Sequence, residues 1–275
     1  MMPGRVDKGG SSLRVDAVVL AGGLNSGPLR DFAPAKSEAL IPIGSRPMVE
    51  YVVNALKHTP EVNRLVVAGP LDELTRPAAA PGGLSRAGGG GRGVETRRRG
   101  VEVRLGAGLA GESRPLALVV AADIPLITPE AISDFLRLCG QRPGEIYYPV
   151  VSREANERKY PGVKRTYVRL RDGCFTGGNL ILVDTRIVER CALLAEEMVR
   201  RRKSPVALAR LLGFKFLLKF LLRRLTLAEA EAKASELLGA SGVAVVSSYA
   251  EVGVDVDKPS DLQLARRLLV KEMRI

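Results

Sequence analysis

Three aspartates follow apolar segments in a way that could bring their carboxylates together. Asp123 ends the apolar run Leu116–Ala122, while Asp255 and Asp257 alternate in an extended segment, so both would face one side. Carboxylates that converge from separate strands form a hard-oxygen site for Mg²⁺, which binds through one or two carboxylates together with substrate phosphates. The pattern predicts that Asp123 and Asp255 hold a metal ion. For Asp257, the competing interpretation is a cap of the last helix, because Pro259 follows it.

A glycine turn follows the first apolar run, Val15–Leu20, at the place where open α/β sheets bind ligands. Gly22 and Gly23 would let a phosphate or a base approach the backbone. The glycines lack the G-x-G-x-x-G spacing of a dinucleotide site. A Walker A loop is also excluded, because Pro28-Leu29 stands where Lys-Ser/Thr is required.

The composition excludes several kinds of catalytic site. Among 275 residues there is one histidine, His58, so a two-histidine zinc site cannot form and any histidine-based triad would have to use it. Cys139, Cys174 and Cys191 lack C-x-x-C spacing and are odd in number, which implies no disulfide framework and favours a reducing cytoplasm. Carboxylates, lysines and arginines must therefore carry any chemistry.

The net charge points to an anionic partner. A formal charge of +12 suits nucleic acid, a membrane surface or phosphorylated small molecules. Nucleic acid is disfavoured, because the aromatic residues that accompany single-strand binding make up only 4% of the chain. The segment Met1–Asp16 has no apolar stretch typical of a signal peptide. No segment reaches the roughly 20 apolar residues of a membrane helix.

Strand-like and helical segments alternate along the chain. This alternation predicts an α/β fold, with a doubly wound, mostly parallel sheet, helices on both faces and a helical C-terminal part. Helices are expected to begin at Pro47, to run from a Thr128 cap to Cys139, and to cover Lys258–Val270. The expected strands are Val15–Leu20, Val62–Ala68, Leu116–Ala122, Glu145–Val151 and Val243–Val246.

Two further segments interrupt this pattern within what we expect to be one domain over residues 1–275. Residues 78–111 contain four consecutive glycines and the run Arg97-Arg98-Arg99, which predicts a flexible, basic excursion. Asp172-Gly173 is typical of a hairpin turn and would join strands at Tyr167–Leu170 and Asn179–Val183.

Residues 185–240 predict a helical insertion. Within it, Lys215, Lys219 and Arg223 are spaced to form one polar stripe on an otherwise apolar helix over Leu211–Leu225. We expect this helix to be buried in the fold or in a homodimer interface. The alternative is a helix that faces a membrane surface or a phosphate.

Four segments of the chain together resemble the nucleotidyltransferases of the molybdopterin guanylyltransferase and molybdenum-cofactor cytidylyltransferase type. The resemblance covers nearly the whole chain and implies a glycosyltransferase-A-like α/β fold. The segments are Leu20-Ala21-Gly22-Gly23, Ala39–Gly44 followed by Arg46-Pro47-Met48, Ala122–Leu126, and Val254–Asp261.

The resemblance implies roles for several residues. Leu20, Ala21, Gly22 and Gly23, together with Asp123, would bind the nucleotide, and Asp123 and Asp255 would bind Mg²⁺. Gly178 and Asn179 resemble the segment that lines the acceptor pocket in related enzymes. The implied reaction is attack of an acceptor phosphate on the α-phosphorus of an NTP, with release of pyrophosphate.

Two features depart from the family pattern. The family usually has Gly-x-x-Arg soon after the glycines, and here the first arginine, Arg30, lies seven residues past Gly23. The family has a lysine two residues before the leucine that corresponds to Leu40, and here Glu38 stands there. A carboxylate cannot neutralise a triphosphate as an ammonium does. Either Arg30 and Lys36 reach the site through a rearranged loop, as the catalytic cations, or transfer is weak or lost.

The resulting expectation is a cytoplasmic, Mg²⁺-dependent nucleotidyltransferase that transfers an NMP from an NTP to a phosphorylated small-molecule acceptor. The alternative from another class is a non-catalytic nucleotide or sugar-phosphate binding protein on the same fold, which Glu38 favours. A third hypothesis is a nucleic-acid or membrane-surface module that uses Arg97–Arg99 and the Lys215, Lys219 and Arg223 stripe.

Overall fold

The computed structural model describes residues 13–69, 116–191 and 212–272. The expected excursion at residues 78–111, with its arginine run, therefore lies outside the described residues, as do residues 192–211 of the helical insertion expected over residues 185–240. The division into one domain with an insertion stays a prediction. Within the described ranges, no helix is long and apolar enough to cross a membrane.

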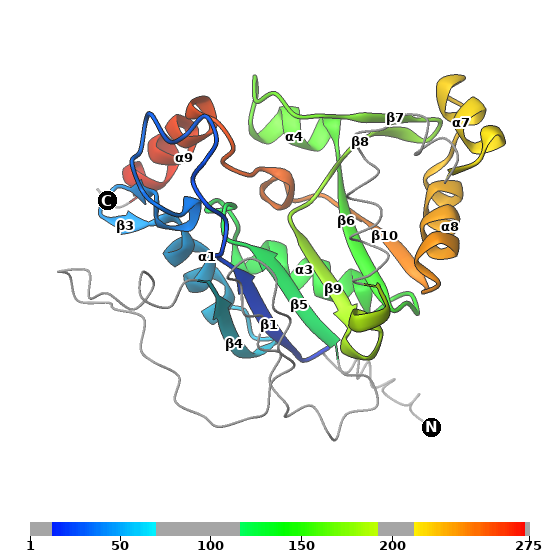
Figure 1. Cartoon of the computed structure of the whole chain (residues 1–275), viewed down its shortest axis with the longest axis horizontal. Coiled ribbons are helices and arrows are strands. Elements are labelled where there is room, and N and C mark those ends of the chain that lie inside the picture. Colours follow the sequence, from blue (N-terminus) through cyan, green and yellow to red (C-terminus); the bar gives the residue numbers. More distant parts are fainter. Residues whose placement is uncertain (1–12, 70–115, 192–211, 273–275) are drawn as a thin grey trace, which may run out of the picture.

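An eight-stranded mixed sheet forms the centre of the molecule (Figure 1). Its strand order is β4-β1-β5-β9-β6-β8-β7, with β10 paired to β6. Six strands run in one direction, and β9 and β8 run the opposite way. The strands are β1 (Val15–Leu20), β4 (Val62–Ala68), β5 (Leu116–Ala121), β6 (Ile146–Ser152), β7 (Val168–Leu170), β8 (Gly173–Gly177), β9 (Leu180–Asp184) and β10 (Gly242–Ser247). The expected mostly parallel α/β sheet is thus confirmed.

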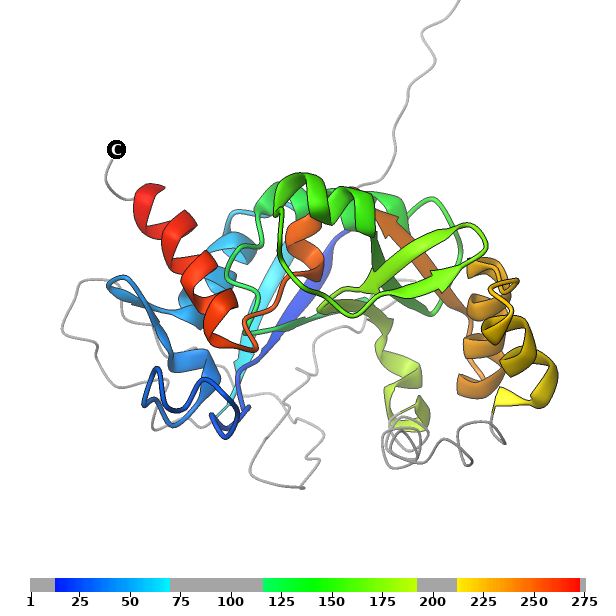
Figure 2. The same cartoon turned by 90° about the horizontal axis from the view of Figure 1, so that it is seen from above.

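Helices cover the sheet as the alternation predicts. Viewed from above, α1 and α3 lie on one face, and a turn that follows β9 lies on the other (Figure 2). Thr128 caps α3, because its hydroxyl accepts a hydrogen bond from the backbone N–H of Ala131 and Pro129 occupies the first turn. The helices are α1 (Met48–Lys57), α3 (Pro129–Cys139), α4 (Arg153–Lys159), α7 (Phe214–Leu221), α8 (Leu227–Leu238) and α9 (Pro259–Glu272).

Short elements connect these strands and helices. A small antiparallel hairpin of β2 (Pro42–Ile43) and β3 (Arg46–Pro47) precedes α1, so the helix begins one residue after Pro47. Three 3-10 turns complete the described elements: η1 (Glu38–Leu40), η2 (Thr185–Ile187) and η3 (Ala250–Gly253).

The predicted hairpin partner at Asn179–Val183 is wrong. The Asp172-Gly173 turn joins β7 to β8, and β9 lies elsewhere in the sheet, between β5 and β6. The break between β8 and β9 falls at Gly178, which packs so closely that a Cβ atom there would lie 2.8 Å from the side chains of Pro149 and Val252. Close packing at this glycine lets the chain leave one strand pair and enter another.

The continuous helix predicted over Leu211–Leu225 is also wrong. Gly213, with φ of 87°, precedes α7, and Arg223 has a φ of 55° just beyond its end. These left-handed residues limit α7 to Phe214–Leu221, and Arg223 leaves the predicted stripe. No side chain of α7 is buried, so it is not a core helix either.

Candidate metal and nucleotide site

One backbone hydrogen bond explains how the three aspartates meet. The N–H of Val256 donates to the carbonyl oxygen of Asp123 at 2.9 Å, which ties the segment after η3 to the end of β5. Val256 is buried in the core, and its neighbours Asp255 and Asp257 project to the opposite side. Carboxylate oxygens of Asp123, Asp255 and Asp257 lie within 4.8 Å of one another. The alternation predicted from sequence is thus present, and Asp257 belongs to this cluster.

Burial and repulsion raise the pKa values of Asp123 and Asp257. Burial, followed by the charges of Asp255 and Asp257 and more weakly of Glu38, raises the pKa of Asp123 to about 7. Burial also raises the pKa of Asp257 to about 6, reinforced by the charge of Asp255 and a hydrogen bond to it. One oxygen of Asp123, Oδ1, is buried and has no hydrogen-bond partner among the described residues. A cation placed here would reduce the repulsion between the carboxylates. It would also give the buried Asp123 Oδ1 an electrostatic partner.

Arg165 is a cationic neighbour of this cluster that the sequence did not single out. Its guanidinium forms an ion pair with the Asp255 carboxylate and also donates to the Asp255 carbonyl oxygen at 2.5 Å. The side chain is only 8% exposed. It lies in the irregular segment between α4 and β7, where no periodic pattern marks its position, so only the folded chain identifies it.

A polar cavity of about 190 Å³ opens beside the aspartates. Asn179 lines this cavity, whereas Gly178 is buried next to it and packs against Pro149 and Val252. Backbone hydrogen bonds fix both residues: Gly178 N–H donates to Pro149 at 2.9 Å, and Asn179 N–H donates to Val252 at 3.0 Å. The full lining is Lys164, Arg165, Thr166, Thr176, Gly177, Asn179, Gly253, Asp255, Asp257 and Lys258.

The glycine turn after β1 is held open by two polar side chains that the sequence did not mark. The Ser37 hydroxyl donates to the carbonyl oxygens of Gly23 at 2.9 Å and Ala21 at 3.2 Å. The amide of Asn25 donates to Ala33 at 2.7 Å and to a second carbonyl further along the loop. Both side chains are buried. They fix the loop from residue 21 to residue 37 as a folded unit rather than a mobile linker.

Glu38 lies against this loop, whereas the two cations predicted to be catalytic are exposed. A Cβ atom added at Gly23 would be 3.6 Å from one carboxylate oxygen of Glu38. Burial raises the pKa of Glu38, and its charge in turn raises the pKa of Asp123. Arg30 and Lys36 both lie on the outer part of the loop. The side of the site that faces the glycine turn therefore carries a carboxylate.

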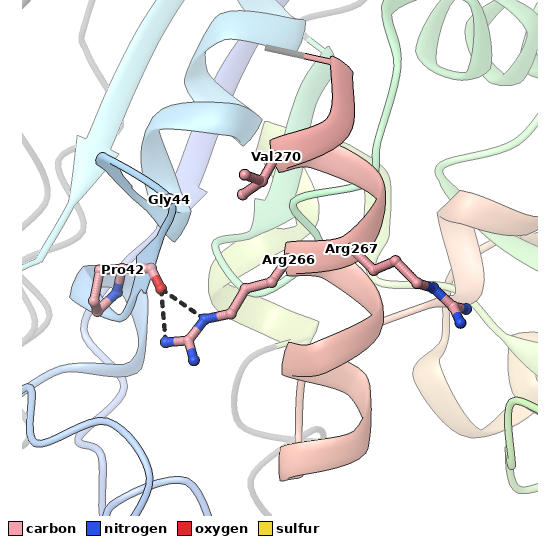
Figure 3. A pocket seen from close by; sticks show the side chains of 5 residues that line it. All are labelled: Pro42, Gly44, Arg266, Arg267 and Val270. Atoms are coloured by element: carbon pink, nitrogen blue, oxygen red, sulfur yellow. Dashed lines mark hydrogen bonds between the residues drawn. The ribbon is translucent and has the colours of Figure 1, made fainter. Parts of the chain in front are cut away.

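A wider hollow of about 520 Å³ lies between the β2–β3 hairpin and α9 (Figure 3). It is lined by Pro42, Gly44, Arg266, Arg267 and Val270, and the Arg266 guanidinium donates to the carbonyl oxygen of Pro42. None of the aspartates lines it. We therefore place the candidate site at the aspartates and the glycine turn.

The residues of the acidic cluster fit a magnesium ion by the chemistry of their donors. All three offer hard carboxylate oxygens, and Asp123 Oδ1 is a buried acceptor without a partner among the described residues. Arg165 holds the Asp255 carboxylate in place. An ion would bind to the carboxylate oxygens of the cluster that Arg165 does not contact.

Comparisons with known proteins agree with this architecture. A family model described as a MobA-like NTP transferase domain matches residues 17–207. A solved structure described as a hypothetical transferase from Thermus thermophilus is 36% identical, with a TM-score of 0.65, and the match covers 90% of this chain and 99% of that one. A nucleotidyl transferase from Methanothermobacter thermautotrophicus is 15% identical with a TM-score of 0.51, over 94% and 99% of the two chains, and shares the fold. No curated protein matches the sequence. The chain belongs to the MobA-like NTP transferase family.

Proposed function

We propose that this protein is a Mg²⁺-dependent nucleotidyltransferase that transfers an NMP from an NTP to a phosphorylated small-molecule acceptor and releases pyrophosphate. The observation that carries the proposal is the convergence of Asp123, Asp255 and Asp257 beside a fixed glycine turn. Carboxylates that converge in this way would provide a place for a metal ion next to the phosphates of a nucleotide.

The chain's own residues supply binding and alignment. The backbone of Leu20–Gly23 would receive the base and phosphates, because Gly22 and Gly23 present no side chain to block their approach. Arg30 and Lys36 are proposed to neutralise the triphosphate by extending their exposed side chains from the loop that carries them. Mg²⁺, held by Asp123 and Asp255, would stabilise the negative charge that develops on the α-phosphate oxygens.

The transfer itself needs no general base. An acceptor phosphate with its second pKa near 6 is largely dianionic at neutral pH, so its oxygen can attack the α-phosphorus directly. One new P–O bond forms, and the bond from the α-phosphorus to the bridging oxygen of pyrophosphate breaks. The requirement for alignment rather than proton transfer agrees with the absence of histidine from the acidic cluster, since His58 lies exposed at the end of α1.

The cavity beside the aspartates supports a phosphorylated acceptor. Lys164, Arg165 and Lys258 provide cations on its wall, and Thr166 and Asn179 provide neutral hydrogen-bonding groups. At about 190 Å³ it would enclose a phosphate and a few more atoms, which suits a small molecule rather than a polymer. A cytoplasmic location, where NTPs are available, agrees with three cysteines that are all free.

The test is pyrophosphate release with each of the four NTPs, Mg²⁺ and a panel of phosphorylated sugars, polyols and cofactor precursors. We expect one nucleotide and one acceptor class to give turnover that chelation abolishes and that Asp255→Asn reduces by at least about a hundredfold, the scale of a lost transition-state contact. Asp31→Asn, a change of the same type at an exposed loop position, is the matched control. Turnover that persists in Asp255→Asn at the wild-type rate would refute the metal assignment.

The second candidate function is a nucleotide or sugar-phosphate binding protein that performs no transfer. Glu38 favours it, because a carboxylate beside the glycine turn repels the triphosphate that transfer would require. This candidate predicts that an NTP raises the melting temperature without any pyrophosphate release. Glu38→Lys should then strengthen NTP binding. Turnover by the unchanged protein would exclude this candidate.

A further inference from the structure

Helix α7 presents an apolar row to solvent. Phe214, Leu218 and Leu221 recur at i, i+4 and i+7, so they share one side of the helix, and their exposed fractions are 76%, 43% and 68%. Leu222, directly after the helix, is 56% exposed and extends the row. Three of the chain's six phenylalanines lie between residues 214 and 220. An apolar concentration of this kind on an exposed helix marks an interaction surface.

Cations border this row, and acids are absent from it. Lys215 and Lys219 follow Phe214 and Leu218 by one position and so lie along the adjacent line of the helix, and Arg223 and Arg224 follow its end. Residues 212–226 contain no aspartate or glutamate. Lys219 forms an exposed ion pair with Glu229 of α8. The other three cations, Lys215, Arg223 and Arg224, form no ion pair with a described residue.

Within the described part of the chain, the exposed apolar row and its cations argue against three other roles for α7: a core helix, a homodimer contact and a nucleic-acid site. No α7 side chain is buried, so the helix does not serve the core. Pairing of α7 with its counterpart in a second copy would bring two groups of four cations together, and this repulsion disfavours a homodimer through this face. A nucleic acid would use the cations, but it offers nothing to the leucines, which cannot stack on bases.

We propose that α7 is a docking helix for the surface of an anionic lipid membrane. Phe214, Leu218 and Leu221 would enter the boundary between headgroups and acyl chains, while Lys215 and the arginines after the helix contact anionic headgroups. In both views the helix lies beside α8, at the end of the described fold opposite α9 (Figures 1 and 2). This inference does not depend on the proposed transfer reaction.

The test is flotation of the full chain with vesicles of phosphatidylcholine alone and of phosphatidylcholine with about 30% phosphatidylglycerol. We expect binding to the anionic vesicles that weakens as salt is raised, and little binding to the neutral ones. Lys215→Glu should lower the partition coefficient by roughly 25-fold, because each basic residue near the surface contributes about fivefold and the change reverses a charge. Leu218→Ser with Leu221→Ser should lower it by at least about tenfold.

Matched controls separate this surface from general charge and hydrophobicity. Lys57→Glu reverses an exposed lysine on α1, and Val246→Ser removes a 50% exposed apolar side chain from β10. Both controls should have partition coefficients within about twofold of that of the unchanged protein. Any small loss in Lys57→Glu should come from its change in net charge alone. Equal loss in controls and α7 variants, no binding of the unchanged protein, or a concentration-dependent dimer that the α7 variants abolish would each overturn the proposal.

Discussion

Replacing Asp123 by asparagine should stabilise the metal-free protein. The carboxyl group of Asp123 has its pKa raised from 3.8 to about 7, first by burial and then by the charges of Asp255 and Asp257. A raised carboxyl pKa means that the folded state holds its proton after the unfolded chain has lost it. The group therefore lowers the free energy of unfolding as pH rises from about 4 to about 7, and the loss persists above that range.

The magnitude follows from the difference between the two pKa values. A difference of about three corresponds to about 4 kcal/mol at pH 8, because each pKa unit equals 1.36 kcal/mol. At about pH 4 the same relation leaves less than about 1 kcal/mol. Asparagine fills the same volume without the charge and can donate to the neighbouring carboxylates. We therefore expect Asp123→Asn to gain up to about 4 kcal/mol at pH 8 and little at pH 4.

Urea denaturation in the presence of EDTA at several pH values measures this gain. Asp31→Asn is the control, because it makes the same chemical change at an exposed position and should leave stability within about 0.5 kcal/mol of the unchanged protein. Adding Mg²⁺ should stabilise the unchanged protein but not Asp123→Asn. If the variant is no more stable than the unchanged protein at any pH, the ionised Asp123 carboxylate does not destabilise the fold, and the prediction is refuted.

Three further changes test other parts of the structure. Arg165→Met should lower the free energy of unfolding by about 2–3 kcal/mol at pH 8, measured by urea denaturation, because it leaves the Asp255 carboxylate without its partner; an effect below 0.5 kcal/mol would contradict this. Gly178→Ala should destabilise the fold by about 1–3 kcal/mol in the same assay, since its Cβ atom would lie 2.8 Å from two side chains, and unchanged stability would show that the contact can relax. Thr226→Ala removes the capping box of α8 and should cost about 1 kcal/mol, with Thr166→Ala, at an exposed residue outside any helix, as its control in thermal melts.

The strands of the sheet and the shared side of Asp255 and Asp257 were predictable, because both depend on local patterns. An apolar run bounded by glycine or aspartate marks a buried strand, and β1 and β4 have the predicted bounds. Alternation likewise places Asp255 and Asp257 on one side of an extended segment. That these carboxylates bind Mg²⁺, and that Arg30 and Lys36 serve the reaction, stays a prediction.

Contacts between distant segments were not predictable. Arg165 pairs with Asp255 from an irregular segment whose course is set by packing, so its sequence neighbours give no signal. The partner of β7 was assigned wrongly because residues 173–177 and 179–183 both have strand character, and only the packing around Gly178 separates them. The length of α7 was wrong because periodicity alone does not show where a glycine such as Gly213 turns left-handed.

The hydrogen bond from Val256 to Asp123 has a consequence for the order of folding. The ligands that it brings together come from segments far apart in the sequence, around residues 123 and 255, so bringing them together is a non-local event of the kind that occurs late. A divalent ion thus finds no site on a partly folded chain and cannot nucleate folding. A bound ion would instead stabilise the folded protein. It would lower the rate of unfolding and leave the rate of folding unchanged.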